Sequence, residues 1–189
     1  MARPVVHDDA LRSRLLDLTA ELVDREGAAQ VTLREVAASA GTSTSAIYSL
    51  FGGKAQLLTA VVDGGFASFA QSQQAAADGG LRALGVAYRE WALAHPALYR
   101  LMFGAGGATS GIEATPDVAD AAMVPLRDAI AAGQRAGELR VVPIEVAAYI
   151  VWGQVHGLVS LELAGLHADV DWGDIYAEAI AAVGRAWAR

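Results

Sequence analysis

Residues 31–54, VTLREVAASAGTSTSAIYSLFGGK, contain two short helical patterns separated by Gly41. Glycine is the usual residue where a helix ends in a left-handed conformation. Ser43 or Thr44 follows at the position where a hydroxyl side chain caps the next helix. Two helices joined by so tight a turn predict a helix-turn-helix.

The first of these helices is marked by its apolar spacing and by its start. Thr32 followed by Glu35 three positions later is the pattern of a capping box, so we expect this helix to begin near Leu33. Its apolar residues follow the i, i+3, i+4, i+7 spacing of one helix face: Leu33, Val36, Ala37 and Ala40.

The second helix divides into an apolar side and a hydroxyl side when its residues are placed about 100° apart. The apolar side collects Ala46, Ile47, Leu50 and Phe51. The other side collects Thr44, Ser45, Tyr48 and Ser49. The apolar side can dock on a core while small polar groups face outward, as a helix that enters a DNA groove requires.

This segment resembles the N-terminal signature of the TetR family of bacterial transcriptional regulators. The elements that carry the resemblance are Thr32, Ala40-Gly41, Ser43-Thr44, Ile47-Tyr48, Phe51 and Gly53-Lys54. The resemblance implies that Thr44, Ser45 and Ser49 meet base edges or nearby phosphates, and that Thr32, Tyr48 and Lys54 hold the phosphate backbone. Packing on the first helix is the alternative for Tyr48. Leu50 can reach a thymine methyl or pack in the core. Positions 49 and 50 depart from many members of the family, so no base preference is carried over.

A second resemblance, to the WHG type of TetR C-terminal domain, covers about residues 80–165. It is carried by WALAHPALYRLMFG at 91–104 and WGQVHGL at 152–158. It implies a helical domain that dimerises through its last two long helices and can hold a small-molecule effector. We take Trp91, Tyr99, Trp152 and His156 as candidate pocket residues, with ordinary core packing as the alternative for each.

Sixteen residues without formal charge, VAAYIVWGQVHGLVSL, lie between Glu145 and Glu162. A helix that is apolar nearly all round is buried on more than one side. Gly153 and Gly157, four positions apart, would let a second helix approach closely, so we place them in a homodimer interface. The alternative is the core of the monomer. The stretch is shorter than the roughly 20 residues that cross a bilayer, so no membrane span is expected.

Helix start and stop signals continue along the whole chain, and no segment shows a convincing strand pattern. A first helix, capped by Asp8 or Asp9 and ended by Gly27, carries a leucine stripe. Later helices are expected near 54–75, 81–94, 96–103, 117–136 with a kink at Pro125, 144–165 and 172–188. The expected fold is all-α with about nine helices. Residues 1–54 would form a three-helix DNA-binding domain, and residues 55–189 an effector-binding and dimerisation domain.

The net charge of -7 opposes binding to nucleic acid at first sight, because lysine and arginine make the phosphate contacts. Residues 1–60, however, hold six basic and seven acidic groups, so that -6 of the net charge belongs to residues 61–189. We therefore expect modest nonspecific DNA affinity with a strong dependence on salt.

Other chemical signals are missing from the sequence. There is no cysteine, and the four histidines show no metal-binding spacing. The loop at 104–111 has Thr109 at the last glycine position of GxGxxG, and there is no GxSxG motif. We expect no enzyme activity, no cofactor and no metal. The N-terminus shows no signal-peptide pattern, which favours the cytoplasm.

Together these patterns predict a ligand-responsive repressor that binds a palindromic DNA operator as a homodimer. The alternative is a helical small-molecule-binding or lipid-binding protein without DNA-binding activity. That alternative leaves the hydroxyl face of residues 44–49 without a purpose.

Overall fold

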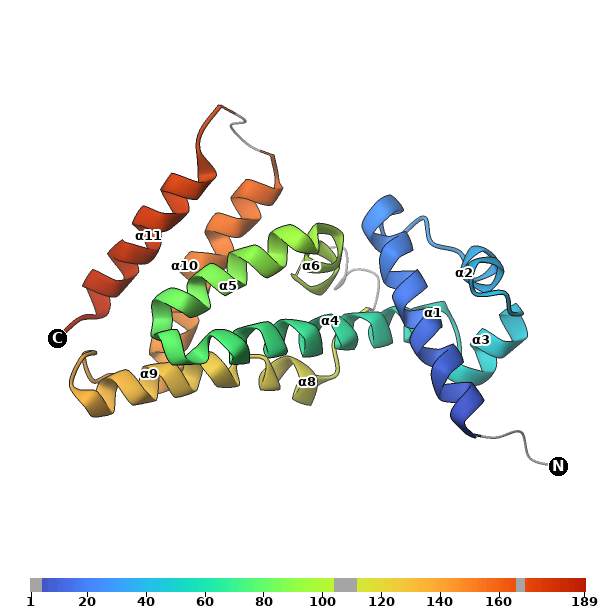
Figure 1. Ribbon diagram of the computed structural model, residues 1–189, viewed down its shortest axis with the longest axis horizontal. Helices are drawn as coiled ribbons and strands as arrows, with labels where there is room; N and C mark the ends of the chain where they lie inside the picture. The colour runs from blue at the N-terminus through green and yellow to red at the C-terminus, as the bar shows by residue number, and fades with distance from the viewer. Residues whose placement is uncertain (1–4, 104–111, 166–168) are drawn as a thin grey trace. The chain divides into compact units, whose positions relative to one another are not determined.

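The computed structural model describes residues 5–103, 112–165 and 169–189, and these ranges form helices joined by turns (Figure 1). The all-α expectation is confirmed: the described residues contain no strand, only an isolated bridge between Leu139 and Ala188. The glycine-rich loop at 104–111 lies outside the described residues. The α-helices are α1 (Val5–Glu26), α2 (Leu33–Ala40), α3 (Thr44–Phe51), α4 (Lys54–Ala76), α5 (Gly80–Ala94), α6 (Pro96–Phe103), α8 (Pro116–Ala121), α9 (Val124–Ala136), α10 (Ile144–Leu163) and α11 (Trp172–Trp187), with a 3-10 turn, η1 (Ala77–Gly79), before α5.

The chain packs as two compact units, each built from two stretches of sequence. Unit 1 comprises Met1–Ala67 and His95–Ala119, and unit 2 comprises Ser68–Ala94 and Asp120–Arg189. Helix α4 therefore contributes its first part to unit 1 and its last part to unit 2. The predicted boundary at residue 54 separates a DNA-binding part from an effector-binding part of the chain by function, and this boundary stays a prediction.

In unit 1, α1 packs against α2, α3 and α6. Leu15 and Leu22 of its leucine stripe are buried, and the Asp24 carboxylate accepts a hydrogen bond from Ala97 N at the start of α6, at 2.9 Å. The expected cap at Asp8 or Asp9 is wrong, because α1 begins at Val5. Asp9 instead lies near the N-terminal end of the helix, where the helix dipole favours a carboxylate.

In unit 2, α5 packs against α9, α10 and α11. Part of the core is a cluster that joins α9, α10 and α11: Ile130, Ala147, Ala148, Val151, Val183 and Trp187. Gly85 lies where α5 contacts α11, and a Cβ atom there would meet the end of the Ile180 side chain. The Tyr176 hydroxyl of α11 also donates to Gly85 O at 2.7 Å.

The expected helix from 117 to 136 is two helices, and Pro125 does not kink it. Helix α8 ends at Ala121, and Pro125 lies in the first turn of α9. Proline suits that position because the first N–H groups of a helix have no partner within it. Pro125 therefore marks the start of α9, and not a kink inside a longer helix.

Candidate functional site

The helix-turn-helix is built by two hydroxyl caps and one left-handed glycine. Thr32 Oγ1 accepts from Glu35 N at 3.2 Å at the start of α2, and Gly41 ends that helix with φ of 64°. Ser43 Oγ accepts from Ala46 N at 3.2 Å at the start of α3. Of the two residues that could cap the second helix, the structure selects Ser43.

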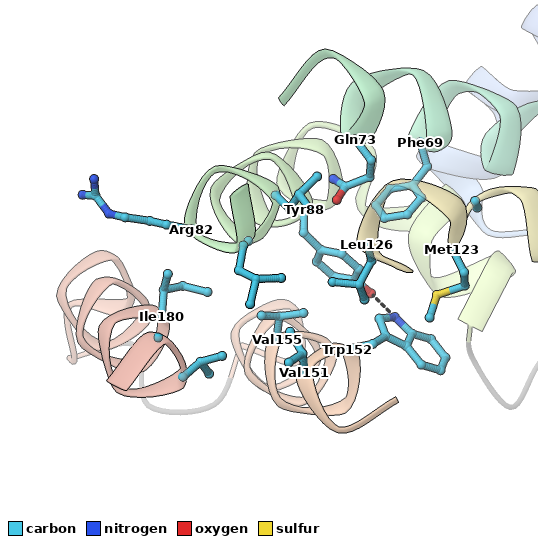
Figure 2. Close-up of a pocket in the computed structure, with 16 residues that line it drawn as sticks. Phe69, Gln73, Arg82, Tyr88, Met123, Leu126, Val151, Trp152, Val155 and Ile180 are labelled. Atoms are coloured by element: carbon cyan, nitrogen blue, oxygen red, sulfur yellow. Dashed lines mark hydrogen bonds between the residues drawn. The ribbon is translucent and has the colours of Figure 1, made fainter. Parts of the chain in front are cut away.

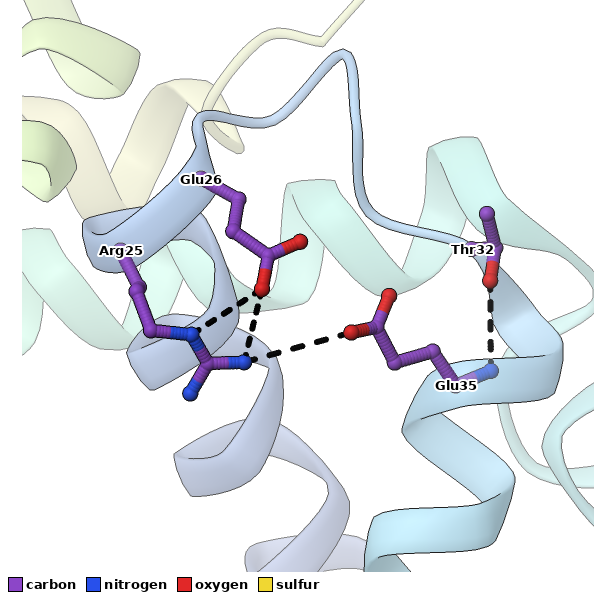
Figure 3. A network of polar contacts seen from close by, with 4 residues as sticks. All are labelled: Arg25, Glu26, Thr32 and Glu35. Atoms are coloured by element: carbon purple, nitrogen blue, oxygen red, sulfur yellow. Dashed lines mark hydrogen bonds and ion pairs between the residues drawn. The ribbon is translucent and has the colours of Figure 1, made fainter.

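The capping box at α2 is only half formed, because the Glu35 side chain turns toward α1 (Figure 3). Its carboxylate lies 4.0 Å from Arg25 Nη2, and the same guanidinium binds Glu26 at 2.8 Å. These groups are partly exposed, so each ion pair contributes little stability. They do link the end of α1 to the first turn of α2.

Helix α3 shows the predicted division into a buried and an exposed side. Ile47 is fully buried, whereas Ser45 and Ser49 are exposed and Tyr48 is 58% exposed. Thr44 is half-buried beside them. The exposed side therefore presents hydroxyl groups, which can donate and accept hydrogen bonds at base edges or phosphates.

Two basic side chains at the surface of unit 1, Arg12 and Lys54, contact residues of this motif or of the loop before it. The Arg12 guanidinium lies over the Phe51 ring, 4.6 Å from its centroid, and Nη1 donates to Leu50 O at 3.4 Å. Lys54 Nζ donates to Ala29 O at 3.2 Å, which ties the loop before α2 to the start of α4. An ammonium group has three N–H donors, so Lys54 can bind a phosphate at the same time.

A surface hollow beside α3 brings a further basic residue to the hydroxyl face. Its walls come from α1, the turn and α3, and include Arg14, Thr42, Ser43 and Ser49. Arg14 is exposed. The sequence alone does not show that Arg14 and Ser49 line the same hollow.

A mostly apolar pocket of about 60 Å³ lies within unit 2, with walls from the last part of α4 and from α5, α9, α10 and α11 (Figure 2). Its aromatic walls are Phe69, Tyr88 and Trp152. The other lining residues are Gln73, Leu81, Arg82, Leu84, Gly85, Ala122, Met123, Leu126, Val151, Val155, Ile180, Val183 and Gly184.

A chain of hydrogen bonds runs through one wall of this pocket. Trp152 Nε1 donates to Tyr88 Oη at 3.3 Å, and Tyr88 Oη lies 2.9 Å from His156 Nδ1. An indole N–H can only donate, so the Tyr88 oxygen accepts from Trp152. The direction of the hydrogen bond between Tyr88 and His156 depends on the tautomer of the imidazole. The other ring nitrogen of His156, Nε2, lies 3.5 Å from Ser160 Oγ.

Comparison with known protein families matches both parts of the chain. Residues 15–61 match the model of bacterial regulatory proteins of the tetR family, and residues 81–186 match the tetracyclin repressor-like C-terminal domain. The chain belongs to the TetR family. It is a DNA-binding transcriptional regulator, as its N-terminal motif predicted. The WHG assignment of the TetR C-terminal domain stays a prediction.

Individual TetR-family and related regulators resemble the chain over most of its length. The HTH-type transcriptional regulator Rv1816 of Mycobacterium tuberculosis is 25% identical, over 83% of this chain and 82% of the relative. The crystal structure of the regulatory protein SCO4313 is 28% identical, with a TM-score of 0.79, over 96% of this chain and 98% of that one. A TetR-family regulator of Pectobacterium atrosepticum shares the fold at 24% identity, with a TM-score of 0.75, over 97% and 95% of the two chains.

The four pocket residues predicted for this TetR-family chain do not all lie together. Trp152 lines the pocket, whereas His156 is not a lining residue but contacts the lining residue Tyr88, with Nδ1 2.9 Å from Tyr88 Oη. Trp91 is buried, with its indole N–H donating to Ser68 Oγ at 3.2 Å, and it is not a lining residue. Tyr99 belongs to unit 1, where its ring contacts Phe103 at 5.0 Å between centroids.

Sequence reasoning missed most of the pocket wall of this TetR-family chain. Tyr88 and Met123 lie at spacings that are ordinary for the core of a helical protein. Phe69 and Leu126 carried no signal that set them apart from other helix-core residues. Residues from five helices form the wall, and the spacing of residues within one helix does not predict which other helices pack against it.

The two glycines assigned to a dimer interface lie on the open side of α10. A Cβ atom at Gly153 or Gly157 would meet no other atom within 4 Å. The same helix exposes several large apolar side chains: Val146, Tyr149, Ile150 and Leu161. By length and composition α10 also passes for a membrane-crossing helix, the single one in the described part of the chain, but core helices pass the same test.

The partial burial of His156 makes the stability of this TetR-family chain depend on pH. Burial lowers the pKa of the imidazole below its ordinary value of about 6.5. In the unfolded chain His156 binds a proton near pH 6.5, whereas in the folded chain it does so only at lower pH. We therefore expect the free energy of unfolding to fall as pH drops from about 6.5 toward the folded-state pKa.

Urea denaturation of the chain and of His156→Gln, at several pH values from 7.5 down, measures this contribution. The variant should lose part of the slope below pH 6.5. Identical pH profiles for the two proteins would show that His156 does not titrate differently in the folded and unfolded states.

Proposed function

We propose that this TetR-family regulator binds a palindromic operator as a homodimer and releases it when a small effector occupies the pocket of unit 2. The observation that carries the DNA part is the exposed hydroxyl face of α3 above a fully buried Ile47. A repressor role, a cytoplasmic location and the functional division at residue 54 are parts of the same proposal.

The proposed contacts follow the exposure of each side chain. Thr44, Ser45 and Ser49 read base edges or nearby phosphates, while Thr32, Tyr48 and Lys54 hold the phosphate backbone. Thr32 is exposed although its hydroxyl also caps α2, and a hydroxyl oxygen that accepts from Glu35 N keeps its own proton for a phosphate. Arg14 adds a positive charge next to Ser49.

Dimerisation is supported by the apolar open side of α10. Large apolar patches on a protein surface mark sites that another molecule covers. A second copy fits because a two-fold dimer places two recognition helices on one side of the duplex, one or more helical turns apart, about 34–36 Å per turn. Gly153 and Gly157 then let the two α10 helices approach closely.

Effector control requires that the ligand bind one conformation of the dimer better than the other. Helix α4 is the natural connection, since it begins at Lys54 and carries Phe69 and Gln73 in the pocket wall. A ligand that displaces Phe69 acts on the helix that starts at the DNA-binding motif. By linkage, operator and ligand must weaken each other by the same factor.

The alternative of a helical ligand-binding or lipid-binding protein without DNA-binding activity is disfavoured by the family assignment. The TetR family is a family of transcriptional regulators, and both parts of the chain match its models. Enzyme activity is not part of the proposal.

Selection of DNA ligands from a random-sequence library tests the operator prediction. We expect the selected DNA to be an inverted repeat, because the dimer presents two copies of α3. We also expect the affinity to fall steeply as the salt concentration rises from roughly 50 to 200 mM. Recovery of non-palindromic or single-stranded sequences alone would overturn the proposal.

Two variants separate base reading from phosphate binding within that experiment. Ser49→Ala should change which bases are preferred, with a loss of about 1–3 kcal/mol at the affected position. Lys54→Gln should weaken binding to all sequences alike. Because Lys54 also donates a hydrogen bond to Ala29 O, the thermal melting of the Lys54→Gln variant is measured to check that it is folded. Equal, sequence-independent losses in both variants would contradict these roles.

A further inference from the structure

We propose that the pocket of unit 2 binds a compact, uncharged and largely hydrophobic molecule, about the size of one aromatic ring. The inference deepens the effector function proposed above and rests on it. Three features of the wall carry it: its lack of inward charge, its internally satisfied polar groups and its small volume.

The pocket wall offers no charge to a ligand. Arg82 is the single charged residue among those that line the pocket, and its guanidinium is exposed and extends away from the cavity (Figure 2). No lining residue is a carboxylate, so a cation would find no counter-charge. Moving an unpaired charge out of water is costly, which selects against both anions and cations.

Helices α5 and α10 also carry a partly buried pair of opposite charges, Arg89 and Glu162, which neutralise each other. Arg89 Nε and Nη2 donate to the two carboxylate oxygens of Glu162 at 2.8 and 2.7 Å. The guanidinium also lies 5.5 Å from the centroid of the Tyr176 ring. This two-point pair leaves neither group to attract a charged ligand, and neither lines the pocket.

The polar groups in the wall are also bonded to one another. Tyr88 Oη accepts from Trp152 and forms a second hydrogen bond with His156 Nδ1. With its amide oriented to suit its neighbours, Gln73 donates to Leu84 O and accepts from Tyr88 N, both at 3.2 Å. Ligand binding therefore does not need a polar ligand group to satisfy the wall, and a hydrocarbon ligand leaves these bonds intact.

The volume limits the ligand to a compact molecule. The free space of about 60 Å³ is below the roughly 150 Å³ that holds a benzene ring, and far below the roughly 300 Å³ of the smallest drug-sized sites. The wall must therefore yield. Met123 is the lining residue best suited to yield, because it is half-buried and its unbranched thioether side chain repacks easily.

The aromatic walls favour a flat ligand. Phe69 and Tyr88 already meet edge to face, with ring centroids 5.2 Å apart and an interplanar angle of 84°. Trp152 borders the same space beside Met123 (Figure 2). A single aromatic ring can add to such an arrangement by edge-to-face or offset contacts.

Three compounds with one skeleton test the charge preference: toluene, benzoate and benzylammonium, at pH 7.5. Binding is measured by calorimetry on the whole protein. We expect toluene to bind at least about tenfold more tightly than either ion, a difference of about 1.4 kcal/mol. Benzoate or benzylammonium binding as tightly as toluene would overturn the inference.

Three variants locate the site and test its size. Val155→Phe fills the pocket and should weaken toluene binding at least about tenfold, whereas Val86→Phe, on α5 but outside the wall and 42% exposed, should not. Met123→Ala should strengthen binding of toluene and admit naphthalene. Because Val155 is buried, folding of its variant is checked by thermal melting, and Met123→Ala tests the site independently.

Operator release, measured by fluorescence anisotropy with the selected DNA, separates this inference from the effector function. Toluene binding with the expected charge preference, but without operator release, would leave the ligand class intact and overturn the switch. Failure of toluene to bind both the unsubstituted chain and Met123→Ala, up to its solubility, would overturn the ligand class, whatever the DNA result.

Discussion

The substitution Gly157→Arg is expected to give a monomer that binds the palindromic operator at least about 100-fold more weakly. A Cβ atom at this position meets no atom within 4 Å, so the single chain has room for a larger side chain. In the proposed dimer the same guanidinium would be buried without a partner in an apolar interface. An uncompensated buried charge costs about 3–5 kcal/mol, and each 1.4 kcal/mol is a tenfold change.

Sedimentation velocity measures the loss of the dimer, and gel shift with the selected inverted repeat measures the loss of affinity. Gly64→Arg is the matched control: Gly64 is an exposed helical glycine of α4, also with no atom within 4 Å of a Cβ. This control should remain dimeric. If Gly157→Arg also sediments as a dimer, the interface lies elsewhere and Gly157 is an ordinary surface position.

The second large effect is expected for Glu162→Ala, which should lower the free energy of unfolding by about 2–3 kcal/mol. The Arg89 and Glu162 side chains are only 24% and 13% exposed. The hydrogen bonds that Arg89 donates to Glu162 raise the pKa of the guanidinium above its usual range. Removing the carboxylate removes that increase, but the ordinary pKa of arginine lies so far above neutrality that Arg89 stays charged. A mostly buried guanidinium is then left without its partner.

Urea denaturation measures this loss as a shift of the midpoint. Glu178→Ala is the control, because Glu178 binds Arg185 at 2.6 Å but the two side chains are 73% and 64% exposed. An exposed ion pair of this kind contributes roughly 0–1 kcal/mol. Replacing both partners, as in Arg89→Met with Glu162→Leu, should restore much of the stability. Equal losses for Glu162→Ala and Glu178→Ala would show that burial of the pair is unimportant.

The helix-turn-helix was predictable from the sequence because its determinants are local. Thr32 caps a helix that begins one residue later, Gly41 takes the left-handed conformation, and Ser43 caps the next helix. Each of these signals acts within four residues, where backbone geometry leaves few choices. The exposed side of α3 followed from the same local periodicity, as the full burial of Ile47 shows.

Helix α10 marks the limit of such reasoning. Its sequence is apolar nearly all round, so periodicity could not separate monomer core from interface. The structure buries one side of the helix and exposes the side with Gly153 and Gly157. That outcome depends on where α5, α9 and α11 pack, which no spacing within α10 encodes.

The sequence by itself determined the helical fold and the DNA-binding motif, whereas only the tertiary structure decided the pocket. Tyr88 joins Trp152 and His156 across more than sixty positions of sequence, while Tyr99, eleven residues from Tyr88, belongs to the other compact unit. Helix propensity and capping act between residues a few positions apart, so they can be read along the chain. A pocket forms only where several helices pack together, and the fit of their side chains determines which helices pack there.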